Sequence, residues 1–287
     1  MAFFWTYSGL KFGIKSVKFP KEKDFYDGFI SSVSFDESKC LNSKNLKGSS
    51  EEYGEIKCLE CELACPTKAI NLNNLYKNLN SKEKIAEKTG GVIDANRCIF
   101  CGVCIDACSD IASAISYSKD FDFNIVSQPY ADKRKVFKKS LFVKHIDTGS
   151  CGACESEINA LNNPYYNMHR LGIFITPSPR FADALLVTGT FTKRMSDIFF
   201  NVLDNIPRPR HVVLIGSCSL TGGVFERSEA GEDGFNAGLL NNTETKEGTD
   251  LNLSPLLDEN VIALPHCPPN PFEILNVLLL IKNGDFK

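Results

Sequence analysis

The feature that most constrains this chain is a run of four closely spaced cysteines, RCIFCGVCIDAC, at residues 97–108. Two residues separate Cys98 from Cys101 and Cys101 from Cys104, and three more precede Cys108. Thiolates at this spacing bind three corners of an iron–sulfur cube and send the fourth sulfur to another cube. Zinc sites usually pair two CxxC knuckles across a longer gap, so zinc is the less favoured alternative. The run predicts an iron–sulfur cluster and therefore an electron carrier.

Length and composition predict two packed domains, because the chain has 287 residues of which 43% are hydrophobic. A net charge of −3 gives no reason to expect nucleic acid as a partner. The longest apolar runs, such as residues 277–281, are too short to cross a bilayer, and the start shows no signal pattern. We therefore expect a cytoplasmic protein that can dock on a membrane complex.

An internal repeat lies in the first half, where FDESKC and VIDANRC each place an aspartate four residues before a cysteine. In the second copy, which ends at Cys98, the other cysteines follow at once. In the first copy, 17 residues intervene between Cys40 and the motif CLECELACP. Glu55 stands where an uninterrupted motif would have its first thiolate. Either Cys40 replaces it across a long loop, or Cys40 is a free thiol and the first cluster is incomplete.

The fourth cysteine of each run is expected to serve the other cluster, which clamps the two halves of the repeat together. The first cluster would then be bound by Cys40, Cys58, Cys61 and Cys108. The second would be bound by Cys65, Cys98, Cys101 and Cys104. Residues 31–120 thus resemble a two-cluster bacterial ferredoxin with one enlarged loop.

The second half alternates strand-like and helix-like segments, which predicts an α/β domain with a parallel sheet. The expected strands are LFVKHI (141–146), DALLVTGT (183–190), HVVLIGSC (211–218) and NVIALPHC (260–267). Helices are expected around residues 195–205 and 272–282. The predicted plan is an N-terminal arm (1–30), an α+β ferredoxin domain (31–130), a basic linker (131–140) and the α/β domain (141–287).

The remaining four cysteines follow the carboxyl ends of these strands, the edge at which open α/β sheets bind ligands. They are Cys151, Cys154, Cys218 and Cys267, and they predict a third cluster, with zinc as the alternative. Glu155 and Glu157 are candidate proton relays, although acidic residues are also common in a first helical turn. His266 is either a substituted ligand or a side chain that tunes the cluster.

The segments HIDTGSCGACESEINALNNPYYNMHRLGI, SPRFADALLVTGTFT, VVLIGSCSLTGGVF and PHCPPNPFEIL give a more specific resemblance. They look like the small subunit of membrane-bound, energy-converting (group 4) nickel–iron hydrogenases and its relative, the 20 kDa subunit of complex I. Gly152 and Ala153 separate the first two cysteines, as in the hydrogenases, whereas His266 stands where glycine is usual. The resemblance implies a flavodoxin-like fold for the second half.

The resemblance also implies a function. The chain would be an electron-transfer subunit, with three [4Fe-4S] clusters joining a redox donor to a nickel–iron site in a partner large subunit. It would hold no nickel–iron site itself. Implied partners are that large subunit, membrane antiporter-like subunits, and soluble ferredoxin or formate dehydrogenase as donor, on the inner face of the cell membrane. The alternative is the equivalent subunit of a complex I-like or sulfur-reducing oxidoreductase without nickel.

Overall fold

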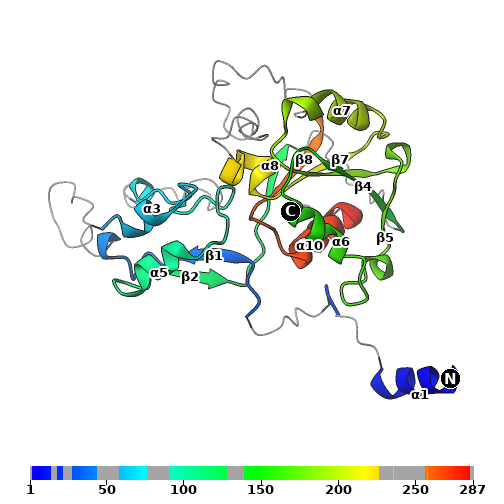
Figure 1. Ribbon diagram of the computed structural model, residues 1–287, viewed down its shortest axis with the longest axis horizontal. Helices are drawn as coiled ribbons and strands as arrows, with labels where there is room; N and C mark the ends of the chain where they lie inside the picture. Colours follow the sequence, from blue (N-terminus) through cyan, green and yellow to red (C-terminus); the bar gives the residue numbers. More distant parts are fainter. Residues whose placement is uncertain are drawn as a thin grey trace.

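A computed structural model describes residues 2–13, 18–21, 28–43, 58–75, 91–127, 137, 139–225, 235, 256 and 258–284. Within these ranges the chain forms two parts, which Figure 1 shows side by side. Residues 44–57, the larger part of the insert after Cys40, lie outside the described residues, as does most of the expected linker at 131–140.

The first part is a small α+β unit, as the sequence predicts. Its strands β1 (Ser32–Phe35) and β2 (Ile115–Ser118) pair antiparallel, with Val33 opposite Tyr117. Its helices are α3 (Glu60–Ala64) and α5 (Val103–Ser109), which contact each other. A single antiparallel bridge, Ile70 with Ile93, joins the two copies of the repeat. Its small core consists of aliphatic side chains together with the buried cysteines Cys40, Cys61 and Cys108.

The second part is built on a six-stranded sheet in the order β3-β8-β7-β6-β4-β5. Its strands are β3 (Asn124–Ser127), β4 (Leu141–Asp147), β5 (Ile173–Ile175), β6 (Ala184–Thr188), β7 (His211–Ile215) and β8 (Asn260–Leu264). The strands β4 to β8 pair parallel as expected, but β3 pairs antiparallel with β8, so the sheet is mixed. Because β3 precedes residue 130, this sheet takes in chain that the sequence analysis assigned to the first domain.

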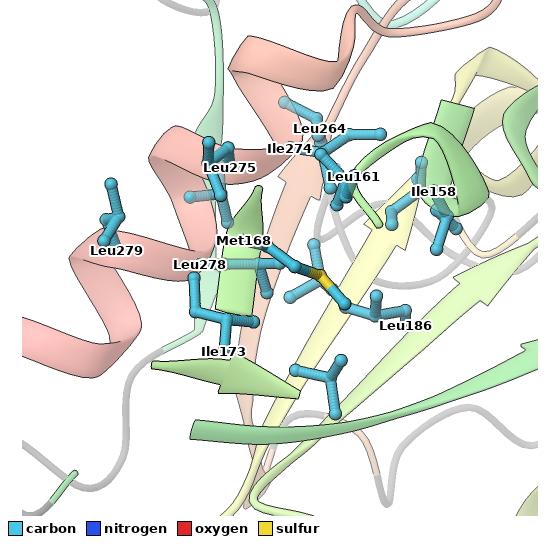
Figure 2. Close-up of a cluster of buried hydrophobic side chains, with 14 of the residues drawn as sticks. Ile158, Leu161, Met168, Ile173, Leu186, Leu264, Ile274, Leu275, Leu278 and Leu279 are labelled. Atoms are coloured by element: carbon cyan, nitrogen blue, oxygen red, sulfur yellow. The ribbon is translucent and has the colours of Figure 1, made fainter. Parts of the chain in front are cut away.

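Helices cover both faces of this sheet. The α-helices are α6 (Ala153–Ala160), α7 (Lys193–Asp204), α8 (Ser217–Thr221) and α10 (Pro271–Asn283). Short 3-10 turns are η1 (Met168–Leu171), η2 (Pro179–Phe181) and η3 (Gly223–Phe225). One apolar layer lies between the sheet and α6 and α10, where Met168, Leu186 and Leu278 meet (Figure 2). The other contains Phe199 and Leu203 of α7.

The sequence explains where the long helix α10 begins and ends. Pro271 occupies its first turn, where the missing N–H costs nothing. The Asn270 side chain accepts a hydrogen bond from the Phe272 N–H, and the Glu273 carboxylate accepts one from the Asn270 N–H. Gly284, at φ 67°, ends the helix in a left-handed conformation that glycine adopts without strain.

The N-terminal arm divides into an exposed helix and a packed segment. Helix α1 (Ala2–Phe12) projects away from both parts, and Phe3 and Trp5 are exposed. Phe19 and Phe29 instead are buried against Phe272 of α10, with ring centroids 5.3 and 5.9 Å from it. Among the described residues, no helix is both long and apolar enough to cross a bilayer.

Candidate iron–sulfur centres

The first group of thiols lies where α3 and α5 meet. Burial raises the pKa of the Cys61 thiol to about 12. The thiols near enough to add to this effect are those of Cys108, Cys58 and Cys40. The structure therefore brings together the four residues that the sequence assigns to the first cluster, including Cys40, which lies on the far side of the insert.

Asn42 closes the insert that separates Cys40 from the rest of this group. Its side-chain nitrogen donates to the Cys58 carbonyl at 2.8 Å, and its side-chain oxygen accepts from the Cys58 N–H at 3.2 Å. Asn42 is buried, so these two bonds hold the ends of the insert together in a place shielded from water. Sequence reasoning missed this residue, because an asparagine beside a polar insert is an ordinary loop residue.

The second group of thiols surrounds the beginning of α5. Burial raises the pKa of the Cys98 thiol to about 11. The thiols that add to this effect are those of Cys104, Cys65 and Cys101. The crossed arrangement expected from the sequence is thus present in space: Cys65 comes from the first copy of the repeat, whereas Cys108 lies with the first group.

The two copies of the repeat share their local hydrogen bonds. Asp36 accepts from the Ser38 N–H, and Asp94 accepts from the Asn96 N–H, both at 3.0 Å. Each aspartate thereby fixes the turn that leads to the first cysteine of its copy. The crossed cysteines match as well: Cys65 Sγ accepts from the Ala69 N–H at 3.2 Å, and Cys108 Sγ accepts from the Ala114 N–H at 3.4 Å.

The third group lies at the carboxyl edge of the six-stranded sheet. Cys151 follows β4, Cys218 lies in α8 just after β7, and Cys267 follows β8. Burial raises the pKa of Cys154 to about 12, and the nearby thiols of Cys267 and Cys151 add to the shift. A hydrogen bond between Cys218 and Cys267 raises the pKa of Cys218 and lowers that of Cys267 to about 7. All four thiols therefore converge, as the strand ends predict.

One local structure occurs in both parts of the molecule. Gly102, within the sequence CGVC, and Gly152, within CGAC, precede α5 and α6 with φ/ψ of 77°/−9° and 86°/−9°. Each glycine adopts the left-handed conformation, so the chain turns directly from one cysteine into a helix that carries the next. At Gly216 a Cβ atom would lie 2.6 Å from the Cys154 sulfur, so only glycine leaves room for that thiol.

The donor set fits iron–sulfur clusters. Each group consists of four cysteines, and burial raises the pKa of Cys61, Cys98 and Cys154 because charged thiolates there lack a compensating positive charge. Bound iron would supply that charge. Within the described part of the chain, no three His, Cys, Asp or Glu side chains are arranged to hold a single metal ion. In a four-iron cube each thiolate binds a different iron, so the thiolates need not meet at one point. The finding therefore excludes a site for a single metal ion among these described residues and does not bear on a cluster.

The other candidate residues lie near the third group. Glu155 lies near His145: burial lowers the pKa of that histidine, and the charge of Glu155 opposes the shift. Burial raises the pKa of Glu157, which lines a small hollow together with Phe100. His266 is buried, and its Nδ1 lies 3.5 Å from the Glu273 carboxylate. The relay role of the two glutamates stays a prediction.

Comparison with known proteins agrees with this division of the chain. Residues 56–112 match the model of the 4Fe-4S dicluster domain, and residues 151–281 match the NADH ubiquinone oxidoreductase 20 kDa subunit family. The dicluster match begins after Cys40, so the place of that cysteine in the first group depends on the geometry described above.

Relatives of this chain align mainly over half its length. A Methanocaldococcus jannaschii protein, MJ1363, is 33% identical over 50% of this chain and 87% of its own length. A Pyrococcus furiosus protein named as a probable membrane-bound hydrogenase subunit, mbhJ, is 33% identical over 51% of this chain and 76% of its own. Formate hydrogenlyase subunit 7 of Escherichia coli is 35% identical over 40% of this chain and 44% of its own length. The chain therefore belongs to the NADH ubiquinone oxidoreductase 20 kDa subunit family, which includes these hydrogenase subunits, and carries a 4Fe-4S dicluster domain before it.

Proposed function

We propose that this chain is the electron-transfer subunit of a membrane-associated nickel–iron hydrogenase. Three [4Fe-4S] clusters, one for each group of thiols, would connect a redox donor to a nickel–iron site in a partner large subunit. The convergence of the twelve cysteines into three groups of four carries this proposal. The names of the hydrogenase relatives support the choice of partner.

The three thiol groups adjoin one another in the order that an electron path through the molecule requires. The first and second groups share α5, which carries Cys104 and Cys108. The second and third meet where the Ser217 hydroxyl donates to the Cys98 carbonyl at 2.8 Å. The second thiol group thus adjoins both of the others, which suits a path that runs from the first group through the second to the third.

The chain's own residues hold the clusters and limit their contact with water. When bound, the clusters supply one-electron chemistry. Cys40, Cys61, Cys108, Cys154 and Cys218 are buried, whereas Cys101 and Cys151 are exposed. An exposed Cys151 leaves the third group open on one side, which suits delivery of electrons to a partner that covers it. We place the partner large subunit there.

The complex is tested by purifying it anaerobically through a tag on this chain. We expect nickel to copurify, about twelve irons per chain, and clusters that hydrogen gas reduces in electron paramagnetic resonance spectra. Cys218→Ser should stop hydrogen from reducing the first two clusters while leaving their iron in place. Ser156→Ala, an exposed change on α6, is the matched control and should change nothing.

Absence of nickel, with clusters that do not respond to hydrogen, would contradict the hydrogenase assignment. That result would favour the alternative, the corresponding subunit of a nickel-free complex I-like oxidoreductase, which the family match also accommodates. Material without iron in any group would contradict both.

A further inference from the structure

Two aromatic rings meet at the seam between the two parts of the molecule. Phe100 lies between Cys98 and Cys101 of the second group, and His266 immediately precedes Cys267 of the third. Their rings are stacked, with centroids 4.2 Å apart and planes 26° apart. Only 1% of His266 is exposed, so the contact is closed to solvent on the histidine side.

Both residues hold a backbone conformation that is unfavourable for their type. The φ angle is 56° at Phe100 and 84° at His266, although neither is glycine. Such residues are uncommon, and a structure keeps the strain only where its surroundings determine it. Here each strained residue places its ring against the other. Both strained residues therefore contribute their side chains to the same contact, between the loop of Cys98 and the loop of Cys267.

Other bonds fix the histidine from the α/β side. Its carbonyl accepts from the Ser217 N–H at 2.8 Å, which ties the loop of Cys267 to the loop of Cys218. Glu273, beside its Nδ1, accepts from the Ser31 hydroxyl at 2.7 Å and from the Asn270 N–H at 2.9 Å. The backbone of His266 is thus held by Ser217, and its ring lies beside a carboxylate that α10 and Ser31 hold in place.

Two hollows adjoin the stacked rings. A hollow of about 300 Å³ is lined by His266 and Cys98, among others. A second, of about 200 Å³, is lined by Phe100 and Pro268. The stack adds a second contact at this seam to the hydrogen bond from the Ser217 hydroxyl to the Cys98 carbonyl. It is the contact that the side chains of Phe100 and His266 make directly with each other.

We propose that the stacked rings of Phe100 and His266 form the path for electrons between the second and third thiol groups, with both side chains acting as positioning residues. This inference rests on the proposed function. With clusters bound, one electron would leave the cluster held by Cys98 and arrive at the cluster held by Cys267, or move the opposite way; neither ring would be oxidised or reduced, and no proton or bond would change. Tunnelling falls off faster across empty space than through touching atoms, so the rings shorten the effective gap.

The test uses the full chain with its clusters restored anaerobically. Phe100→Leu and His266→Asn each remove one ring, and asparagine tolerates a positive φ. Phe100→Tyr keeps the ring, and Phe181→Leu makes the same change as Phe100→Leu at a residue that is 73% exposed and lies elsewhere. For each variant we would measure iron per chain, the reduction potential of each cluster, the magnetic coupling between clusters, and the rate of internal electron transfer after flash reduction.

We expect the internal rate of electron transfer to fall about tenfold or more in Phe100→Leu and His266→Asn, because removal of either ring leaves a cavity in the path. The magnetic coupling should weaken in both variants, the potentials should stay constant in Phe100→Leu, and Phe100→Tyr and Phe181→Leu should match the parent chain. An unchanged rate in both ring-removing variants would overturn the inference, as would shifted potentials without a slower rate. Loss of iron from both variants would make the stack a purely structural contact and overturn it as well. Fewer than about twelve irons in the parent chain would instead contradict the proposed function.

Discussion

The two parts of the molecule depend on their cysteines to different degrees. In the dicluster part, Cys40, Cys61 and Cys108 make up a third of the buried core. In the α/β part, two much larger apolar layers pack on the faces of the sheet, and Cys154 is the one cysteine that joins them among the described residues. A small domain without enough apolar surface depends on its metal, whereas a large core does not. Cluster binding should therefore be part of folding in the first part and an addition to a folded frame in the second.

Removal of iron is the strongest test of this contrast. After chelation of the full chain, the amides of β1 and β2 should exchange as fast as those of an unfolded chain, while those of β6 and β7 stay protected. Hydrogen exchange read by mass spectrometry would measure both regions at once. If the amides of β6 and β7 lost protection to the same extent, the α/β part would depend on its cluster too, and the contrast would be wrong.

A cavity in the α/β core should have the next largest effect. Phe199 is fully buried, so Phe199→Ala should lower the free energy of unfolding of this part by about 3–5 kcal/mol. Its neighbour Ile198 is 50% exposed, and Ile198→Ala should change that free energy by less than about 1 kcal/mol. Urea unfolding followed by exchange of the β6 and β7 amides would show the difference. Iron in the first two groups should remain, and its loss would show that the parts unfold together.

Acid should weaken the α/β part through His211. Burial lowers the pKa of His211 from 6.5 to about 4. The unfolded chain takes up a proton below pH 6.5 while the folded one does not until about pH 4, so stability is full above pH 6.5 and falls as the pH drops through this window. The loss is about 3 kcal/mol at most. Protection of β7 amides, measured from pH 7 to 4.5, should depend less on pH in His211→Gln; an equal dependence would assign the acid sensitivity to other groups.

The smallest effect is expected in a turn of the dicluster part. Asp94→Ala removes the bond from the Asn96 N–H and should cost about 1 kcal/mol, little beside the effect of the metal. Asp36→Ala makes the matching change in the first copy of the repeat, where the aspartate is equally exposed and also accepts from the Ser38 hydroxyl, so it should cost at least as much. Thermal release of iron, followed by the loss of visible absorbance, would compare the two variants. A loss of iron from either one at ordinary temperature would mean that these turns, and not the clusters, hold this part together.

Much of the fold could be predicted because its signals are local. The apolar runs at β4, β6, β7 and β8 are each five or more residues long, and a glycine or cysteine follows each within three residues. Strands β3 and β5 were missed, since four and three residues are too few to show a periodic pattern. Because β3 was missed, the antiparallel edge of the sheet was not predicted either.

The grouping of thiols was more predictable than what surrounds them. Cysteine spacing reflects the short reach of a loop around a cluster, so it indicates which sulfurs can meet. The Asn42 contact with Cys58 and the Phe100 stack on His266 join residues that are distant in sequence, and neither pairing has a sequence signature. Such contacts depend on how a loop closes or how two domains dock, and a single sequence records neither.

The dicluster part is attached to the α/β part at both of its ends. Phe19 and Phe29 hold the chain that enters it against α10, and β3 holds the chain that leaves it beside β8. A carrier domain that swings between donor and acceptor needs a single flexible hinge, and two fixed attachments do not allow such a swing. This subunit should therefore work as a stationary conductor, in which a new donor must come to the first cluster because the first cluster cannot travel to the donor.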